Sequence, residues 1–544
     1  MRLDPCVPRA LTPCVFRLAI SLAAVAGMGI PPGPGFAAPP DFTEGDIDSL
    51  IQATIAGIPG TSLSLEEALG LGFENATSVR DAESALVAAR GELRRERGDF
   101  DPEIFVAAER SGEDAPTASA FSGADVLETE ETSAGAGARI RLRTGTEIEA
   151  SVNTTKFTTN STFATLDPQY DTFGALTVRQ PLLSGFGPSA RAGLTAAERR
   201  FQAAEARYRD ALLALESDLE AAYWEIHAAE RDFAVQRLVR DRAAAFLDEV
   251  RTRARAGLVG PNEVASARVF LAEQELALID REEALDGTSD RMVSLIGVRP
   301  AGTSLRFRVK DTPPEGFPVP PVDELVAAAV EHNQEVRATR AEAASVEALA
   351  RAARWDALPE LDVFGSLGGR GLSGTGRDVV FGSDTLRTDI DGGFGDSFGQ
   401  VTGRDFPTWS VGVSLVVPLG FREGRGERDR LRGEAGRAEE RVRAAVRLLE
   451  EAVREAHRKL VHGSQRLQAS REGMEAAQEQ VRIGFIEYRN GRSTAFELVR
   501  LGADLAASQK RYSESLVRTA RAAAELKRLT AGVYDASARN RNGS

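Results

Sequence analysis

Histidine is the side chain best suited to proton transfer and metal binding at neutral pH, and this chain of 544 residues has four. His227 and His332 show no ligand spacing with a carboxylate triad. His457 and His462 are five residues apart, so one helix face does not hold both. No nucleophile motif accompanies them. We therefore expect no catalytic residue, no metal site and no cofactor.

Gly369, Gly371 and Gly374 have the GxGxxG spacing of a phosphate-binding loop. Such a loop binds phosphate where a helix begins and its N–H groups are free. Here the glycines lie in a Gly- and Ser-rich segment between predicted strands, with no helix behind them. We interpret the spacing as a chance match and do not expect an enzyme.

The first 37 residues are typical of a signal peptide for export. Their apolar run at 18–30 follows three arginines, is too short to span a bilayer, and precedes small residues at 35 and 37 that offer a cleavage site. A buried N-terminal helix is the alternative. Cys6 and Cys14, the two cysteines of the chain, both lie in this segment. The exported chain would therefore have no disulfide and no cysteine for a lipid anchor.

The composition excludes one class of partner and limits the ways of crossing a membrane. A net charge of −14 argues against nucleic acid, because phosphate binding needs a basic surface. Hydrophobic residues make up 42% of the chain, which is enough for a core. After the signal peptide no run of about 18 apolar residues appears, so no transmembrane helix is expected. The exported chain is then either soluble or a β-barrel in a membrane.

The sequence repeats itself. Residues 64–106 and 321–364 align, and YRNGRSTAFELV at 488–499 matches the break RARAGLVGPNEV at 253–264. Both halves have the order helix, strands, long helix, glycine break, helix. This order predicts the following division of the chain: signal peptide 1–37, linker 38–60, first repeat 61–298 with strands at about 102–182 and a hairpin tip near 257, linker 299–321, second repeat 322–531 with strands at about 360–418 and a tip near 491, and tail 532–544.

The predicted helices are unusually long. From 188 to 256 apolar residues recur at steps of three and four, which is the seam of a coiled-coil-like helix. About 70 residues correspond to roughly 100 Å of helix. The helices at 61–99 and 261–298 are about half as long, so two of them end to end would match the long one. Such lengths suit a rod or the wall of a tube.

The predicted strands alternate apolar and polar residues. The first half offers four candidates, at 102–110, 134–143, 147–156 and 171–181. A three-residue turn, Thr144–Thr146, would pair Arg143 with Glu147 and Leu142 with Ile148. Strands of about ten residues with one apolar face fit an outer-membrane barrel. A soluble β-sandwich is the alternative. Because an open edge is not tolerated in lipid, a barrel would need copies of the chain under cyclic symmetry.

These features together resemble the outer-membrane efflux protein family, the TolC-like channel-tunnels. The resemblance is carried by SLEEALGLGFENATSVRDAE near the start, QPLLSGFG after the first strands, AGLVGPNEVASAR at the first hairpin tip and YRNGRSTAFELVRL at the second. It covers nearly all of the exported chain in the correct order. Family members typically have two strands in each half, and the four candidates in the first half depart from that pattern.

The resemblance implies a mainly α fold with β. Long coiled-coil-like helices would form an α-barrel, and the strands would contribute to a shared trimeric transmembrane β-barrel. It implies a homotrimer in outer-membrane lipid, joined to a periplasmic adaptor protein and an inner-membrane efflux or ABC transporter. The chain would be the passive exit duct of a tripartite efflux or type I secretion system for drugs, ions or polypeptides. A secreted or periplasmic coiled-coil scaffold with soluble β modules is the alternative.

The family also implies roles for residues at the hairpin tips, where polar links close the periplasmic mouth of the channel. The residues that match the closing set and the acidic pore ring are Asn262, Glu263, Tyr488 and Glu497. The tips that would dock the adaptor are formed by Gly257, Leu258, Val259, Gly491 and Arg492. Three copies of Glu497 in a ring would favour cations. Arg500 stands where some relatives have a second acidic residue. The alternative is that all of these are ordinary solvated charges.

Overall fold

The computed structural model describes residues 47–118, 122–299, 306–314, 316–382, 384–490 and 492–534. The predicted signal peptide at 1–37 therefore lies outside the described residues. The chain divides into two units at Leu50, and helix α1 (Ile47–Ala56) crosses that division. The description below concerns the unit that begins at Ile51.

The described helices come in two matching sets. The first set is α2 (Leu65–Asn75), α3 (Thr77–Gly98), α4 (Ala192–Arg255) and α5 (Pro261–Ile296). The second set is α6 (Val322–His332), α7 (Gln334–Asp356), α9 (Arg422–Arg489) and α10 (Ala495–Leu529). With 64 residues, α4 is about 100 Å long at 1.5 Å per residue. The predicted fold of long helices with strands is confirmed.

The helix predicted at 61–99 is wrong in its first part. Strand β1 (Thr61–Leu63) comes first, and α2 begins only after Ser64. The Ser64 hydroxyl accepts the Glu67 N–H at 3.2 Å and the Glu67 carboxylate accepts the Ser64 N–H at 2.8 Å, a capping box. A second break occurs at Ala76, whose extended backbone separates α2 from α3. Asn333 interrupts α6 and α7 in the same way.

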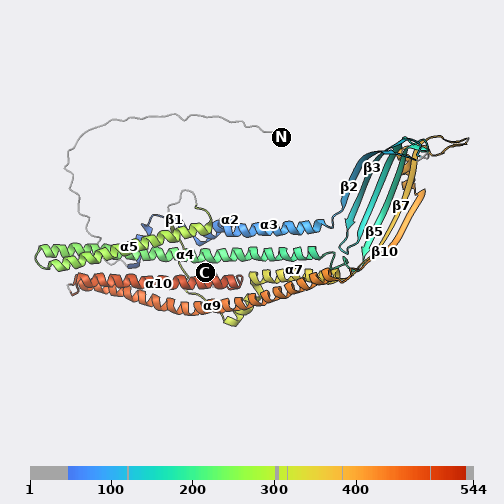
Figure 1. Cartoon of the computed structure of the whole chain (residues 1–544). Coiled ribbons are helices and arrows are strands. Elements are labelled where there is room, and N and C mark those ends of the chain that lie inside the picture. The colour runs from blue at the N-terminus through green and yellow to red at the C-terminus, as the bar shows by residue number, and fades with distance from the viewer. Residues whose placement is uncertain are drawn as a thin grey trace, which may run out of the picture. The chain divides into compact units, whose positions relative to one another are not determined.

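Two shorter helices lie along each long one (Figure 1). Leu93 of α3 packs against Leu194 near the start of α4. Ala267 of α5 packs against Leu247 near the end of α4. In the second half α7 and α10 both pack on α9, and Leu431 of α9 contacts α7. The long helices thus bury apolar seams against two partners in succession, which stabilises them without a globular core.

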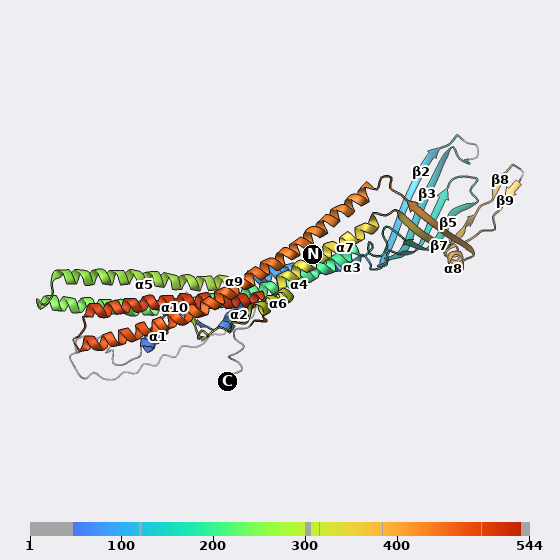
Figure 2. The ribbon, with the colours of Figure 1, turned by 90° about the horizontal axis from the view of Figure 1, so that it is seen from below.

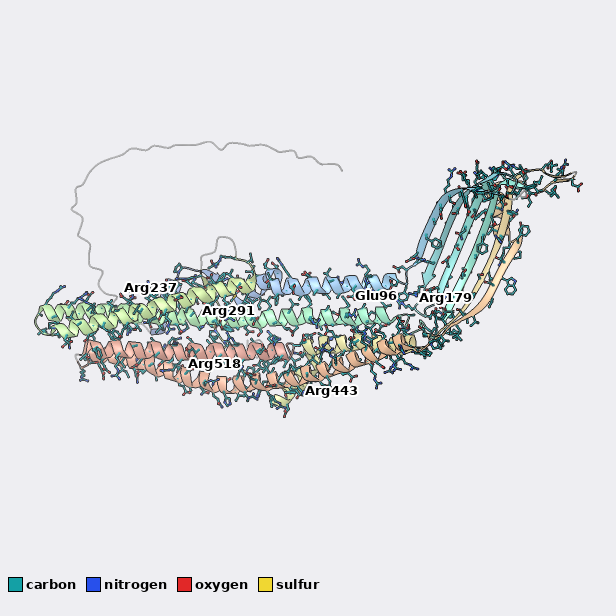
Figure 3. The ribbon with its side chains drawn as sticks, viewed as in Figure 1. Glu96, Arg179, Arg237, Arg291, Arg443 and Arg518 are labelled. Carbon is teal, nitrogen blue, oxygen red and sulfur yellow. The ribbon has the colours of Figure 1, made fainter. Side chains whose placement is uncertain are left out.

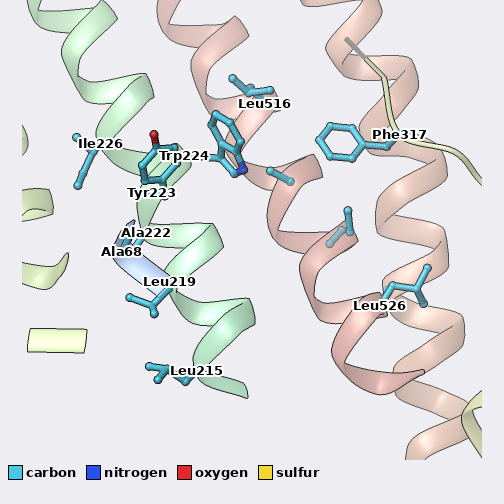
Figure 4. Packing of buried hydrophobic residues seen from close by; sticks show 14 of the residues in the cluster. Ala68, Leu215, Leu219, Ala222, Tyr223, Trp224, Ile226, Phe317, Leu516 and Leu526 are labelled. Atoms are coloured by element: carbon cyan, nitrogen blue, oxygen red, sulfur yellow. The ribbon is translucent and has the colours of Figure 1, made fainter. Parts of the chain in front are cut away.

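The largest hydrophobic cluster lies where the two halves meet. Tyr223 and Trp224 of α4 are buried there with Phe317, Leu516 and Leu526 (Figure 4). The Tyr223 hydroxyl donates to the Asp311 carboxylate at 2.7 Å and accepts the Asp311 N–H at 3.2 Å. Strand β6 (Phe307–Val309) beside it pairs in parallel with β1. The segment between the repeats is therefore bound to the first half.

One antiparallel sheet contains strands from both halves. Its described order is β10-β7-β5-β4-β3-β2. The strands are β2 (Glu103–Pro116), β3 (Val126–Arg141), β4 (Glu147–Thr159), β5 (Leu166–Pro181), β7 (Glu360–Gly376) and β10 (Phe406–Val416). All four strand candidates of the first half thus lie in the sheet, and the strands extend into the segments that the alternation left as loops.

Short elements connect β7 to β10. Strands β8 (Val379–Phe381) and β9 (Asp384–Leu386) form a small hairpin, and helix α8 (Phe394–Gly403) follows. Figure 2 shows α8 beside β7. The sequence pattern did not predict this helix, because 394–403 contains three glycines, which oppose helix formation.

The predicted register of the β3–β4 hairpin is wrong by two residues. Arg141 lies opposite Glu147, and Ile140 lies opposite Ile148. The connection is a five-residue loop, closed by the Leu142 N–H bonded to the Thr146 carbonyl at 2.8 Å. The loop is held from outside, since the Gly187 N–H donates to the Thr144 carbonyl at 3.1 Å. A slip of two residues keeps every side chain on its own face, so alternation alone does not distinguish the two registers.

Candidate functional site

The sheet has one face that is apolar and exposed, which we name the apolar face. Its members alternate along all six described strands and share register across them. They include Ile104, Val106, Ile140, Ile148, Leu176, Val178, Val363, Leu367, Trp409, Val411, Val413 and Leu415. Ile104 is 83% exposed and Trp409 is 76% exposed. So much contiguous apolar surface in contact with water is unfavourable, which indicates that something apolar covers it.

The opposite face of the sheet is polar and carries ion pairs between neighbouring strands. Arg139 bonds Glu103 at 2.7 Å. Arg179 of β5 bonds Asp362 of β7 at 2.5 Å, close to the point where the helices meet the sheet (Figure 3). Ser366 and Ser410 share a hydrogen bond at 2.8 Å on the same face. An apolar face backed by a charged one is the pattern of a wall between lipid and water.

Both outer strands of the sheet lack a described neighbour on one side. These edges are β2, which follows α3, and β10, which leads into α9. Neither edge strand is short, since β2 has 14 residues and β10 has 11. Long, open edges expose rows of N–H and C=O groups that readily pair with another strand.

At the other end of the helices, α4 and α5 join in a tight turn. Gly257 has a φ of +74°, which suits glycine at the end of a helix. The Leu258 N–H donates to the Arg253 carbonyl at 2.9 Å and closes the cap. The Leu258 side chain is 74% exposed, whereas Val259 packs against the cluster that contains Leu247. Pro261 starts α5 at the position where its missing N–H costs nothing.

The second turn joins α9 to α10. Gly491 lies outside the described residues. Arg492 is exposed, and its N–H donates to the Glu487 carbonyl at 2.9 Å. The Thr494 hydroxyl accepts the Glu497 N–H at 3.2 Å and caps α10. This bond gives the segment around Glu497 a local structural role.

A polar cluster joins the two long helices just before these turns. The Tyr488 hydroxyl of α9 donates to the Glu249 carboxylate of α4. The other Glu249 oxygen accepts from Arg253 at 2.6 Å. Burial, together with the bond to Glu249, raises the pKa of Tyr488 to about 12. The Tyr488 O–H therefore stays available as a donor throughout the neutral pH range.

The structure does not bring the predicted mouth residues into one cluster. Asn262, Glu263 and Glu497 are exposed, and within the described chain their side chains make no hydrogen bond or ion pair. Only Tyr488 has a side-chain partner, and that partner is Glu249, which the sequence did not single out. Arg253 four residues after Glu249 was a visible signal for an ion pair, but nothing local connects Glu249 to Tyr488.

The described residues give no sign of metal chemistry or of a membrane-spanning helix. In that part of the chain no group of His, Cys, Asp or Glu side chains could hold a metal ion. None of the described helices is long and apolar enough to cross a membrane. The GxGxxG glycines lie on β7, where Gly369 and Gly371 leave room for α8.

Solved structures of known proteins share this fold. The outer-membrane channel OprN is 17% identical to this chain. The match covers 86% of this chain and 90% of OprN, with a TM-score of 0.61. The Campylobacter jejuni CmeC outer membrane channel is 12% identical over 88% of both chains, with a TM-score of 0.60. The open state of the Neisseria gonorrhoeae MtrE outer membrane channel is 16% identical over 86% of this chain and 89% of that one, with a TM-score of 0.57.

At the level of sequence, no curated protein matches the chain. The model of the outer membrane efflux protein family does match, at residues 159–298 and 325–532, which is more than half of the chain. The match includes both hairpin tips and the sheet strands β5, β7 and β10. The protein therefore belongs to the outer membrane efflux protein family and is an outer-membrane channel-tunnel of an efflux system that extends into the periplasm.

Proposed function

We propose that three copies of the chain form one exit duct that works with a periplasmic adaptor protein and an inner-membrane efflux or ABC transporter. The observation that carries the proposal is the open sheet with one exposed apolar face. In lipid this sheet needs partners at both edges, because unsatisfied backbone groups are costly there. Cyclic copies of the same chain supply them. Drugs, ions or polypeptides would leave through the duct without chemistry on it.

The directions of the edge strands favour this closure. Strand β2 runs away from the helices and β10 runs back toward them. Beside β10 of one copy, β2 of the next would therefore add as another antiparallel strand and continue the alternation around the ring. Ile104 and Val106 of β2 would then extend the apolar face past Trp409 and Val411 of β10. Six described strands from each of three copies give an eighteen-stranded barrel.

Engineered cysteines test this junction on a chain whose only cysteines, Cys6 and Cys14, lie in the predicted signal peptide. Val106→Cys would be combined in turn with Trp409→Cys, Val411→Cys or Val413→Cys, which together scan the register. After oxidation of outer-membrane fractions, we expect at least one pair to give covalent dimers and trimers on a non-reducing gel. Val106→Cys alone is the control and should give no trimer.

Two results of this experiment would contradict the proposal. A disulfide within one chain would mean that a single copy closes its own sheet. The absence of any disulfide in all three pairs, with the protein recovered in the outer membrane, would mean that β2 and β10 do not meet between copies.

The hairpin tips are proposed as the surface that docks the adaptor. Leu258 supports this, because an apolar side chain 74% exposed at a turn is unfavourable in water. Gly257, Val259, Gly491 and Arg492 would complete the surface. A photo-crosslinking amino acid at Leu258, used in the native host, should capture a periplasmic adaptor identified by mass spectrometry. The same probe at Thr252, exposed earlier on α4, is the control. Equal capture of the adaptor at both positions would show that the tip is not the docking surface.

Asn262, Glu263, Tyr488 and Glu497 remain the proposed residues of the periplasmic mouth, and Glu249 now joins them. The bond from Tyr488 to Glu249 supports a role for this pair within one copy. Asn262 and Glu263 have no described partner within the chain, so any bond they make at the mouth comes from a neighbouring copy. Glu497 would contribute an acidic ring only in the trimer.

A further inference from the structure

Helix α8 is fastened to the apolar face of the sheet rather than to the polar one. Val401 packs toward Gly174 of β5, and Ser397 lies over Gly371 of β7. The Ser397 and Thr172 hydroxyls share a hydrogen bond at 2.8 Å. The Gln400 side chain accepts the Leu372 N–H at 2.8 Å and donates to the Leu372 carbonyl at 3.2 Å. The helix is thus held in place through polar and apolar contacts together.

Two phenylalanines of α8 lie beside its sheet-facing side and remain partly exposed. Phe394 is 46% exposed and Phe398 is 39% exposed, and their ring centroids are 5.8 Å apart. The one charged side chain of the helix, Asp396, accepts the Gly393 N–H at 2.8 Å and caps the first turn. The two rings and the neighbouring Gly395 and Gly399 therefore form an exposed apolar strip along one flank of the helix.

The level of α8 on the sheet marks a boundary. Toward the helices the apolar face continues through Leu367 and Trp409, which lie opposite each other. Away from the helices the same face becomes polar, since Tyr170 lies opposite Lys156 and Lys156 opposite Thr132. The glycines that receive α8, Gly369 and Gly371, lie between these two zones. The helix therefore covers the rim of the apolar face that is distant from the long helices.

We propose that α8 is an interfacial helix whose Phe394 and Phe398 side chains insert among outer-leaflet lipids, at the boundary between headgroups and acyl chains. Lipid is favoured as the occupant because the phenylalanine surface continues the exposed apolar face. Aromatic side chains at the rim of an apolar wall are typical of this boundary. The helix would anchor the depth of the barrel in the membrane. This inference rests on the proposed function, in which the apolar face meets lipid.

Depth-dependent quenching of a fluorophore tests the inference on the full-length channel. Phe398→Cys, Val411→Cys and Asn153→Cys would each be labelled with bimane and reconstituted into vesicles. The lipids would carry a nitroxide at either carbon 5 or carbon 12 of one acyl chain. Val411 represents the middle of the apolar face, and Asn153 is exposed on the polar face. Recovery of heat-modifiable trimers from each variant shows that it has folded.

The expected result follows from the depth of an interfacial helix, about 5–10 Å into the leaflet. The label at position 398 should be quenched at least about twofold more by the shallow nitroxide than by the deep one, consistent with that depth. The label at 411 should show the reverse order, and the label at 153 should be quenched by neither. An unquenched label at 398 beside a quenched one at 411 would overturn the inference, whether water or a neighbouring copy covers α8. An unquenched label at 411 would instead show that the proposed membrane sheet is wrong.

Discussion

The Glu249 carboxylate binds two side chains at once, Tyr488 from α9 and Arg253 from its own helix. Arg253 keeps the carboxylate in place, and the Tyr488 O–H then links the two long helices just before both hairpin tips. A hydrogen bond to a charged group contributes about 1.5–3 kcal/mol. Such a link is strong enough to bias the mouth toward one arrangement and weak enough to be broken by a partner.

Tyr488→Phe removes this hydrogen bond while it keeps the ring. We expect a larger single-channel conductance or a higher open probability in planar bilayers. Loss of about 1.5 kcal/mol would raise the open fraction roughly tenfold. Glu249→Gln should act in the same direction. Tyr208→Phe, on α4 far from the tips, is the matched control and should leave the recordings unchanged. If the recordings of Tyr488→Phe are identical to those of the parent, the bond between Tyr488 and Glu249 does not help to close the channel.

Glu230 on α4 is 2% exposed, and burial raises its pKa to about 8. The unfolded chain releases this proton near pH 4.5, whereas the folded chain keeps it until about pH 8. The stability that the neutral carboxyl contributes is therefore complete below pH 4.5 and is lost as the pH rises through 8. The Val309 N–H donates to the Glu230 carboxyl at 3.2 Å, and a glutamine oxygen could accept the same bond.

Glu230→Gln should therefore be more stable than the parent at pH 8.5, by about 1–3 kcal/mol, and similar to it at pH 5. The midpoint of thermal unfolding, measured in detergent across this pH range, checks the prediction. Glu275→Gln, at an exposed site on α5, is the control and should shift neither midpoint. A pH profile of Glu230→Gln parallel to that of the parent would contradict the assignment.

At the scale of elements, the close packing of α8 on the sheet depends on small residues in β7. A Cβ added at Gly371 would lie 1.9 Å from the Ser397 carbonyl oxygen, so the helix or the strand must shift. At Gly365, on the same face nearer the long helices, the nearest atom to such a Cβ is the Ser410 carbonyl oxygen at 3.6 Å, an ordinary contact. The two glycines therefore form a matched pair for substitution.

Gly371→Ala should loosen α8, at a cost of about 1–3 kcal/mol for overpacking. Faster tryptic cleavage after Arg404, which directly follows α8 and is exposed, would report this change. Gly365→Ala should leave the cleavage rate unchanged. If both variants are cleaved like the parent, the contact between α8 and β7 does not hold the helix in place.

At the scale of the whole molecule, the number of strands sets the width of the proposed barrel. The circumference of a barrel grows roughly linearly with strand number. Eighteen strands would give a diameter about 1.5 times that of twelve, the number expected from two strands in each half of three copies. End-on projections by electron cryomicroscopy would measure it. A diameter that fits twelve strands would mean that the hairpin of β2 and β3 stands outside the wall.

Membership in the efflux protein family also decides between the two functions that the sequence left open. The scaffold with soluble β modules explained the helices but required no exposed apolar face on the sheet. The structure has such a face on all six described strands. The division into repeats at 61–298 and 322–531 stays a prediction, as do the signal peptide and the absence of a lipid anchor.

The sequence by itself determined the long helices and the strands of the large sheet, because these depend on periods of a few residues and on glycine and proline at breaks. Only the tertiary structure decided the hairpin register of Arg141 and Glu147, since a slip of two residues preserves both faces. The same holds for the partner of Tyr488, because Glu249 lies 239 residues earlier in the chain. Helix α8 was hidden for a related reason: its glycines oppose helix formation locally, and contacts with β5 and β7 stabilise it.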